Sequence, residues 1–323
     1  MRMSRKSTRR ELSIITVGLS PAWDITCCGR NLDWGLHKYI DEQTIRPAGK
    51  ALNVSKALAW MGQRNIAAGL WGRNDYKQML TAVRSLWPFI TVKMTAVADD
   101  TRQNVTVVDT ARNRDMHLRN RSELVSPAAL RRLKADLEVL VSKRSVCVFA
   151  GAMVEDKLLP DIVQIIESCH RRGAKIVLDT SGPALKEIVD TGQVWLIKPN
   201  VRELGELLGE QVQDNPASLA QAGRELSKKV NLIVISRGKK GAVLVTRHGV
   251  LQGRCIARRK TLSTVGCGDY LLAGFLKDFV RTPHAASALK TGLKVATARA
   301  WGWDEGKTWP QVQKQIAIDV ARI

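Results

Sequence analysis

Four residues near the C-terminal third of the chain could do chemistry together: Gly266, Cys267, Gly268 and Asp269. The glycines fall at the first turn of residues 269–280, an apolar segment with helical periodicity that begins at Asp269. The backbone N–H groups of a first helical turn have no partners within the helix and lie at the positive end of its dipole, so such a turn binds phosphate without side chains. Glycine lets the backbone approach closely, and a carboxylate beside it can accept a proton from an attacking hydroxyl. The alternative is that Gly and Asp merely cap a helix.

The elements that must position this turn alternate regularly from about residue 126. Continuous apolar strands separated by helices indicate a parallel sheet covered on both faces. We expect helices at 126–143, 156–173, 182–192 and 215–230, and strands at 145–151, 174–180, 194–200 and 231–236.

The rest of the chain is predicted to extend this sheet and to add a lid. Residues 12–19 are expected to form a strand and 49–62 a helix, 241–247 and 250–259 an antiparallel pair, and the remainder from 266 only helices. Two extended segments without helices, 25–46 and 91–119, predict a small β-sheet lid, with two edge hairpins as the alternative. We therefore predict one domain, 11–323, preceded by a basic disordered tail, 1–10.

The amino-acid composition limits the kinds of molecule that the protein can bind and the compartment in which it works. Lys and Arg total 51 against 30 Asp and Glu, a formal charge of +21 that must attract anions. The first ten residues hold five of the positive charges, and they lack the apolar core of a signal peptide. There is no apolar run of about 18 residues, so a membrane span is not expected. The six cysteines lack metal-site spacing and indicate reduced residues of a cytoplasmic protein.

The segment STVGCGD resembles the C-terminal signature of the PfkB, or ribokinase-like, carbohydrate kinases. The resemblance implies a three-layer, doubly wound, mostly parallel α/β sheet with a small β lid. It also implies that ATP is the phosphate donor and Mg²⁺ the cofactor. In this family the glycine turn holds the transferred phosphoryl group, so Gly266, Cys267 and Gly268 would supply backbone N–H groups and Asp269 would be the catalytic base.

Four further segments extend the resemblance over nearly the whole chain. SPAWD and PAGKALNVSKALAWMG resemble the substrate-side motifs, KPNVREL the motif that organises magnesium and its waters, and SRGKKGAVLV the nucleotide loop. Each has an ordinary structural alternative, such as a helix start for KPNVREL or a hairpin turn for SRGKKG. The implied residues are Asp24, Gly49, Lys50 and Asn53 for the substrate, Asn200 and Glu203 for the metal and phosphates, and Ser236, Gly238 and Gly241 for the nucleotide.

Within the family, PAWD, AGK-x-x-N and TR-x-NV are most similar to the phosphosugar branch of 1-phosphofructokinases and tagatose 6-phosphate kinases. Thr101, Arg102 and Asn104 form the third motif. A phosphorylated acceptor needs cations at its far end, which Lys50 and Arg102 would provide. Arg102 could equally be a solvated strand charge.

The chain also departs from the family pattern. The usual G-S-L-P segment is FAGAMVEDK at 149–157, Cys267 replaces an alanine, and Tyr270 stands where Ser or Ala is common. These changes leave open a kinase of an unphosphorylated sugar or nucleoside, and a catalytically poor sugar-phosphate sensor. Nucleic-acid binding, suggested by the charge, lacks an accompanying motif. A homodimer through the lid is a further expectation from the resemblance.

Overall fold

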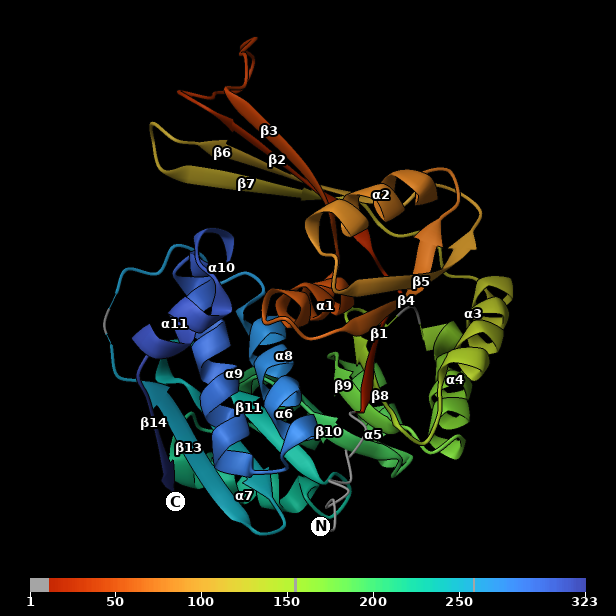
Figure 1. Ribbon diagram of the computed structural model, residues 1–323, viewed down its shortest axis with the longest axis vertical. Helices are drawn as coiled ribbons and strands as arrows, with labels where there is room; N and C mark the ends of the chain where they lie inside the picture. The colour runs from red at the N-terminus through yellow and green to blue at the C-terminus, as the bar shows by residue number, and fades with distance from the viewer. Residues whose placement is uncertain (1–11, 154–155, 258) are drawn as a thin grey trace, which may run out of the picture.

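The computed structural model describes residues 12–153, 156–257 and 259–323, so the predicted tail 1–10 lies outside the described residues. Its main body is a large sheet covered by helices, with a second, smaller sheet projecting from one end (Figure 1). The main sheet has the strand order β14-β13-β12-β11-β10-β9-β8-β1-β4-β5. Its strands are β1 (Ser13–Gly18), β4 (Asn65–Gly72), β5 (Ile90–Val97), β8 (Ser145–Ala150), β9 (Lys175–Asp179), β10 (Val194–Ile197), β11 (Leu232–Ser236), β12 (Ala242–Thr246), β13 (Gly249–Cys255) and β14 (Ile318–Arg322).

Helices cover both faces of this sheet. Adjacent strand residues alternate between the faces, so Ile14 packs with helices α1, α8 and α9, whereas Ile15 packs with α3 and α4. The predicted three-layer α/β fold is therefore confirmed. The helices are α1 (Lys50–Trp60), α2 (Tyr76–Leu86), α3 (Pro127–Leu140), α4 (Leu159–Arg171), α5 (Pro183–Asp190), α6 (Val201–Leu208), α7 (Pro216–Leu226), α8 (Cys267–Arg281), α9 (Ala285–Ala300), α10 (Trp303–Gly306) and α11 (Trp309–Gln315), with short 3₁₀ turns η1 (Asp156–Leu158) and η2 (Gly238–Lys240).

The two ends of the sheet differ in strand direction. Strands from β5 to β11 run parallel, whereas β12, β13 and β14 are antiparallel to their neighbours. The predicted antiparallel pair is thus confirmed as β12 and β13. The prediction that only helices follow residue 266 is wrong, because residues 318–322 form β14 and hydrogen-bond along β13. This short strand alternates only weakly in polarity, and pairing rather than pattern defines it.

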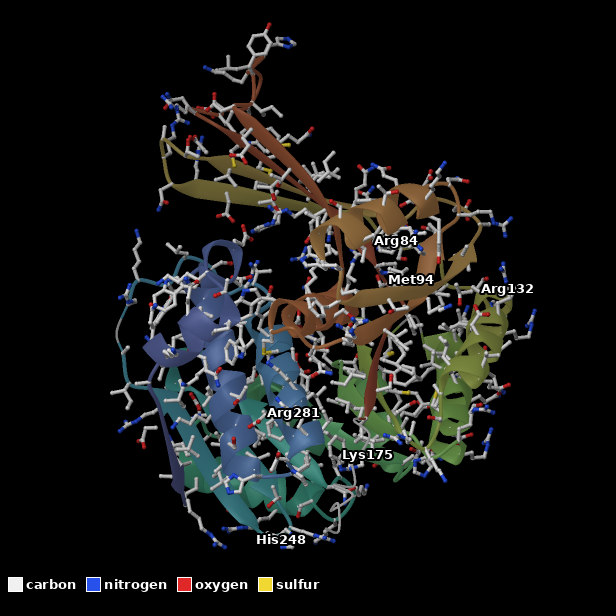
Figure 2. The ribbon with its side chains drawn as sticks, in the orientation of Figure 1. Arg84, Met94, Arg132, Lys175, His248 and Arg281 are labelled. Atoms are coloured by element: carbon white, nitrogen blue, oxygen red, sulfur yellow. The ribbon has the colours of Figure 1, made fainter. Side chains whose placement is uncertain are left out.

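The projecting sheet is the lid, with the order β3-β2-β6-β7. Its strands are β2 (Ala22–Gly29), β3 (Glu42–Ala48), β6 (Gln103–Asp109) and β7 (Arg114–Arg119). Figure 2 shows this sheet standing clear of the main body with side chains on both of its faces. The predicted lid segment 91–119 is wrong for its first residues, because β5 pairs in parallel with β4 and belongs to the main sheet.

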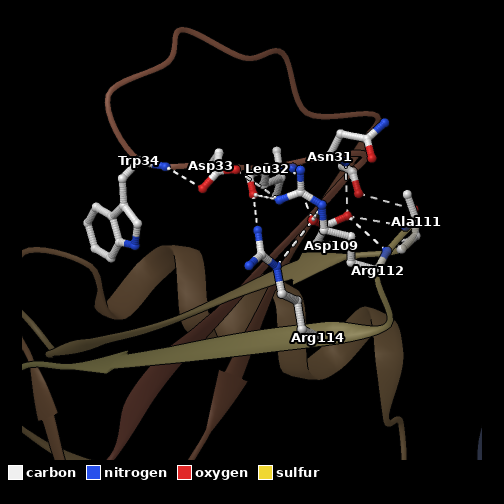
Figure 3. A network of polar contacts seen from close by, with 10 residues as sticks. Asn31, Leu32, Asp33, Trp34, Asp109, Ala111, Arg112 and Arg114 are labelled. Carbon is white, nitrogen blue, oxygen red and sulfur yellow. Dashed lines mark hydrogen bonds and ion pairs between the residues drawn. The ribbon is translucent and has the colours of Figure 1, made fainter.

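The tip of the lid is organised around one buried carboxylate, Asp109 (Figure 3). Backbone N–H groups from two separate loops donate to it, which ties the β2–β3 connection to the β6–β7 turn. Although burial opposes ionisation, these hydrogen bonds hold the pKa of Asp109 below its ordinary value. The donors are the amides of Asn31, Leu32, Ala111 and Arg112 and the Arg114 side chain.

Helices α8 and α9 approach each other closely because glycines face each other in the contact. A Cβ added to Gly274 would lie 2.9 Å from the Cα of Gly292, and one added to Gly292 would lie 2.7 Å from the Leu271 carbonyl oxygen. This contact fixes the position of α8, whose first turn is the glycine segment. In the part of the chain that the structure describes, no helix is both long and apolar enough to span a membrane.

Candidate active site

The glycine turn lies at the N-terminus of α8. Gly266 is the residue before the helix and adopts the left-handed region, at φ 78°, which glycine enters without strain. Among the described residues, the amides of Gly268 and Asp269 have no acceptor, whereas the Cys267 amide donates to the Thr264 carbonyl at 3.4 Å. Unpaired N–H groups at a helix start form an anion site. Burial raises the pKa of the Cys267 thiol to about 11, so the thiol stays neutral.

Asp269 is buried at the base of this turn, with 4% of its surface exposed. The Asn53 side chain, from α1, donates to Asp269 Oδ2 at 2.9 Å. Burial and the nearby charge of Asp179 raise the pKa of Asp269 to about 7, while Asn53, Lys50 and Lys198 act in the opposite direction. A carboxyl group with a pKa near neutrality is well matched to general base catalysis.

A buried ion cluster lies beside Asp269, at the carboxyl ends of β9 and β10. The fully buried carboxylate of Asp179 accepts from Lys50 Nζ at 2.9 Å and lies 3.3 Å from Lys198 Nζ. Burial opposes ionisation of Asp179, but the two ammonium groups outweigh it and hold its pKa below the ordinary value. A Cβ on Gly268 would lie 3.0 Å from Lys198 Nζ, so this ammonium packs directly against the glycine turn.

Gly49 and Asn53 owe their positions to the start of α1. Gly49 precedes the helix at φ 123°, and a Cβ there would lie 3.2 Å from the Pro21 Cα. Glycine is therefore required where this loop crosses the loop after β1. The crossing sets the direction of α1 and turns Lys50 toward Asp179 and Asn53 toward Asp269.

Asn200 and Glu203 start α6 at the carboxyl end of β10. Asn200 Oδ1 accepts from the Glu203 amide and Glu203 Oε2 accepts from the Asn200 amide, each at 2.9 Å, so the two form a capping box. These contacts are those of an ordinary helix start, which was the structural alternative for the KPNVREL segment. The predicted role of the two residues toward a metal stays a prediction. Burial opposes the charge of Lys50, but Asp179 outweighs it and raises the pKa of Lys50, with a smaller contribution from Glu203.

The predicted nucleotide loop follows β11. Ser236 donates through its backbone to the Pro199 carbonyl and bridges to Asn200, which places the end of β11 beside the start of α6. Gly238 and Gly241 both have positive φ, at 54° and 89°. A Cβ on Gly241 would lie 2.0 Å from the Gly253 carbonyl oxygen, so glycine is needed for β13 to pass this close to the loop.

A cleft of about 690 Å³ lies between the lid and the glycine turn. One end is formed by Gly266 and Asn53, and the lid contributes Asp24. Lys50, Arg102 and Asp269 are not among its lining residues. The other lining residues are Thr26, Cys28, Glu42, Thr44 and Arg46 of the lid, and Lys56, Ala59, Trp60, Leu86, Trp87, Pro88, Phe89, Val265, Tyr270, Arg299, Asp304 and Glu305.

Two residues of the TR-x-NV motif form a hydrogen-bond chain that ends at the side chain of Asp24. The Asn104 side chain donates to Asp24 Oδ1 at 2.8 Å, and Arg102 donates to Asn104 Oδ1 at 2.9 Å. The remaining donors of Arg102 reach the backbone carbonyls of Ser20, Pro21 and Asn120. Thr101 is buried and hydrogen-bonds the Gly72 amide. The structure therefore brings Arg102 to the edge of the site without placing it in the cleft, and its role toward a substrate phosphate stays a prediction.

Tyr270 forms part of the cleft wall and is held in place. Its hydroxyl donates to Asp304 Oδ2 at 2.9 Å, and Arg299 donates to the same oxygen at 3.0 Å. Burial raises the pKa of Tyr270, so the phenol remains a neutral donor. The ring thus joins α8 to α10. The other departure from the family pattern, 149–157, includes residues 154 and 155, which lie outside the described residues.

Sequence reasoning missed Asp179, Lys198, Lys56 and Arg299. Asp179 and Lys198 each end an apolar strand, and a charged residue at the carboxyl end of a buried parallel strand is a signal that could have found them. Lys56 lies one helical turn after Asn53 in the same motif. Arg299 gives no such signal, because it reaches the site only through the packing of α9 on α8.

Comparison with known proteins places this chain in a family. The pattern of the pfkB family carbohydrate kinases matches residues 21–300. The chain is 26% identical to the 1-phosphofructokinase of Haemophilus influenzae, covering 83% of this chain and 84% of that protein. It is 28% identical to the 1-phosphofructokinase of Borreliella burgdorferi, covering 89% and 91%.

Solved structures share the fold. Phosphofructokinase-2 from Escherichia coli in complex with fructose-6-phosphate superposes with a TM-score of 0.85 at 21% identity, over 94% of this chain and 97% of that chain. A possible 1-phosphofructokinase from Thermotoga maritima gives a TM-score of 0.81 at 23% identity, over 96% and 99%.

The doubly wound sheet, the lid and the family match together define a phosphotransferase whose acceptor is an alcohol group. The match spans most of the sequence, and the chain belongs to the pfkB family of carbohydrate kinases.

Proposed function

We propose that this kinase transfers the γ-phosphate of ATP to a hydroxyl of a ketohexose phosphate, as a 1-phosphofructokinase or tagatose 6-phosphate kinase does. The observation that carries the proposal is the buried Asp269, held by Asn53 at 2.9 Å beneath a helix start with unpaired amides. The names of the curated relatives favour the phosphosugar branch. The cleft between lid and turn has room for such an acceptor.

In this mechanism Asp269 takes the proton of the attacking hydroxyl. The amides of the turn from Gly266 to Gly268, with Lys198 behind them, stabilise the negative charge on the transferred phosphoryl group. Lys50 lies at the same end, where it would face the phosphates. Asp24 and Asn53 would hydrogen-bond the sugar hydroxyls, and closure of the lid would exclude water, which otherwise competes as acceptor. Ser236, Gly238 and Gly241 would lie along the nucleotide.

The residues beside Asp269 fit a magnesium ion. Mg²⁺ prefers oxygen ligands and keeps several waters. Glu203 uses only one carboxylate oxygen in its capping box, and Asp179 Oδ2 is buried without a hydrogen-bond partner in the described structure. Among the described residues, no group of three metal-ligating side chains comes together. Glu203 and Asn200, with Asp179, would hold the ion, and it would neutralise charge on the ATP phosphates.

The lid also supports a proposal about assembly. Ile25, Ile45, Val105 and Leu118 lie opposite one another across its strands and therefore share one face. Ile45 and Leu118 are about half exposed, at 47% and 51%. The other face, which includes Asp24, borders the cleft. An exposed apolar sheet face favours association, and we propose a homodimer through the lid.

The free cysteines among the described residues support the proposal that the enzyme works in the reducing cytoplasm. The acceptor is tested by measuring magnesium-dependent ADP release with fructose 1-phosphate, fructose 6-phosphate, tagatose 6-phosphate, fructose and ribose. Turnover with one phosphosugar at far lower concentration than with fructose or ribose supports the proposal. Preferred turnover of an unphosphorylated sugar contradicts it. Binding of a phosphosugar without turnover would instead identify a sensor.

A further inference from the structure

Lys56 is a cleft residue that the proposed mechanism does not use. It lies on α1 three residues after Asn53, so the two side chains share one face of the helix, about 4.5 Å apart along its axis. Asn53 contacts Asp269 at the reacting end of the cleft. Lys56 therefore stands one turn farther from the base, and both line the same cleft.

The surroundings of Lys56 leave its charge without a carboxylate partner. Its Nζ lies 4.7 Å from the centroid of the Trp87 ring, and Leu86 and Phe89 extend this apolar wall. Within the described residues, no carboxylate lies at ion-pair distance from Lys56. Burial lowers its pKa to about 8, with smaller contributions from Arg299 and Arg46, while Asp24 acts in the opposite direction. At neutral pH the ammonium is still mostly charged.

Three other charged side chains of the cleft, Arg46, Arg299 and Asp24, already have partners, whereas Glu42 of the lid is exposed to solvent. Arg46 lies 3.5 Å from Glu305, and Arg299 lies 3.0 Å from Asp304 and 3.3 Å from Glu305. Asp24 accepts from Asn104. A positive charge that is poorly solvated and unpaired gains most from an anionic ligand, because attraction between charges is stronger where water is excluded.

We infer that Lys56 binds the phosphate that the acceptor already carries, with the reacting hydroxyl one helical turn away at Asp269. The inference rests on the proposed function, since it names the residue that distinguishes a phosphorylated from an unphosphorylated acceptor. The sequence predicted that Lys50 and Arg102 would bind this phosphate, but the structure gives both side chains other partners. Lys50 pairs with Asp179 beside the glycine turn, and Arg102 is bound to backbone carbonyls outside the cleft.

The test compares Lys56→Met, which keeps the length of the side chain but loses the charge, with Lys56→Arg, which keeps the charge. Lys77→Met, at an exposed position of α2, is the matched control for loss of a lysine. The measurements are kcat and KM for the best phosphorylated ketohexose and for unphosphorylated fructose. Binding of inorganic phosphate by calorimetry gives a readout that does not depend on turnover.

We expect Lys56→Met to raise KM for the phosphosugar roughly 10- to 100-fold, the usual effect of losing one charge-assisted hydrogen bond. The kcat with that sugar and the kinetics with fructose should not change, and Lys56→Arg should restore most of the affinity. An unchanged KM, or an equal rise in KM for fructose, overturns the inference.

The two proposals can fail separately. If the natural enzyme turns over no phosphosugar, the proposed function fails, and phosphate binding then decides the role of Lys56. Phosphate affinity that falls at least roughly 10-fold in Lys56→Met, but not in Lys77→Met, supports the phosphate site. Equal affinity in both variants contradicts it.

Discussion

Asp269 can act as a base only when it is ionised, and its surroundings decide at which pH that happens. Burial and the Asp179 charge raise its pKa to about 7. The protonated form therefore dominates below neutrality, and the ionised form above it. We predict that kcat/KM rises about tenfold per pH unit below pH 7 and levels off above it, because one proton must leave the free enzyme. A pH profile of kcat/KM, measured with saturating magnesium, checks this. A flat profile between pH 5.5 and 7 would contradict it.

Asp179 links the stability of the site to the ionisation of Asp269. Replacing Asp179 with Asn leaves Lys198 and Lys50 without their carboxylate, and breaking a buried ion pair in this way typically costs about 3–5 kcal/mol. Urea unfolding should show a loss of this size. The substitution also removes a charge that raises the pKa of Asp269, so the acidic limb of the pH profile should move to lower pH. A limb that stays in place would show that Asp179 does not act on the base.

At the scale of elements, the contact between α8 and α9 holds the glycine turn in position. Alanine normally stabilises a helix relative to glycine, but a Cβ on Gly292 would lie 2.7 Å from the Leu271 carbonyl oxygen. We therefore predict that Gly292→Ala lowers the free energy of unfolding by about 1–3 kcal/mol and lowers kcat, because α8 must shift. Gly306→Ala, in open space on α10, is the control. Equal stability of the two variants in thermal unfolding would contradict this account.

Most helices and strands followed from sequence where a cap or an apolar run marked them, but α2 and β4 were not predicted. Ser126 and Pro127 marked the start of α3, and the Ser126 side chain accepts from the Ala129 amide as a cap should. By contrast, β14 was missed, and β5 was predicted as extended but assigned to the lid, because no local pattern encodes the strand with which a segment pairs. The residues of the site divide in the same way, into those marked by a local motif and those brought in by tertiary packing. Asp269 and Asn53 were found through motifs, whereas Arg299 reaches the cleft only because α9 packs on α8.

At the scale of the whole molecule, the positive charge is spread over many elements. Figure 2 labels Arg84 on α2, Arg132 on α3 and Lys175 on β9, in separate parts of the molecule. Such a distribution favours attraction of anionic substrates in general over one nucleic-acid groove.

The lid face gives a prediction about assembly. A charge at Leu118, in the exposed apolar row, should prevent association, so Leu118→Glu should halve the molar mass measured by light scattering. Val139→Glu is the control, because Val139 is 85% exposed on α3, away from the lid. A natural protein that is already monomeric, or a variant that keeps its mass, would contradict a lid dimer.

The central claim is that Asp269 removes the proton from the acceptor hydroxyl. The most direct test is ADP release with the best phosphosugar, comparing the natural enzyme with Asp269→Asn, which keeps the shape and the neighbouring Asn53. We predict that kcat falls roughly 10²- to 10⁴-fold, the usual contribution of a general base, while both substrates still bind. Turnover of Asp269→Asn within about tenfold of the natural rate, less than any general base contributes, would contradict it.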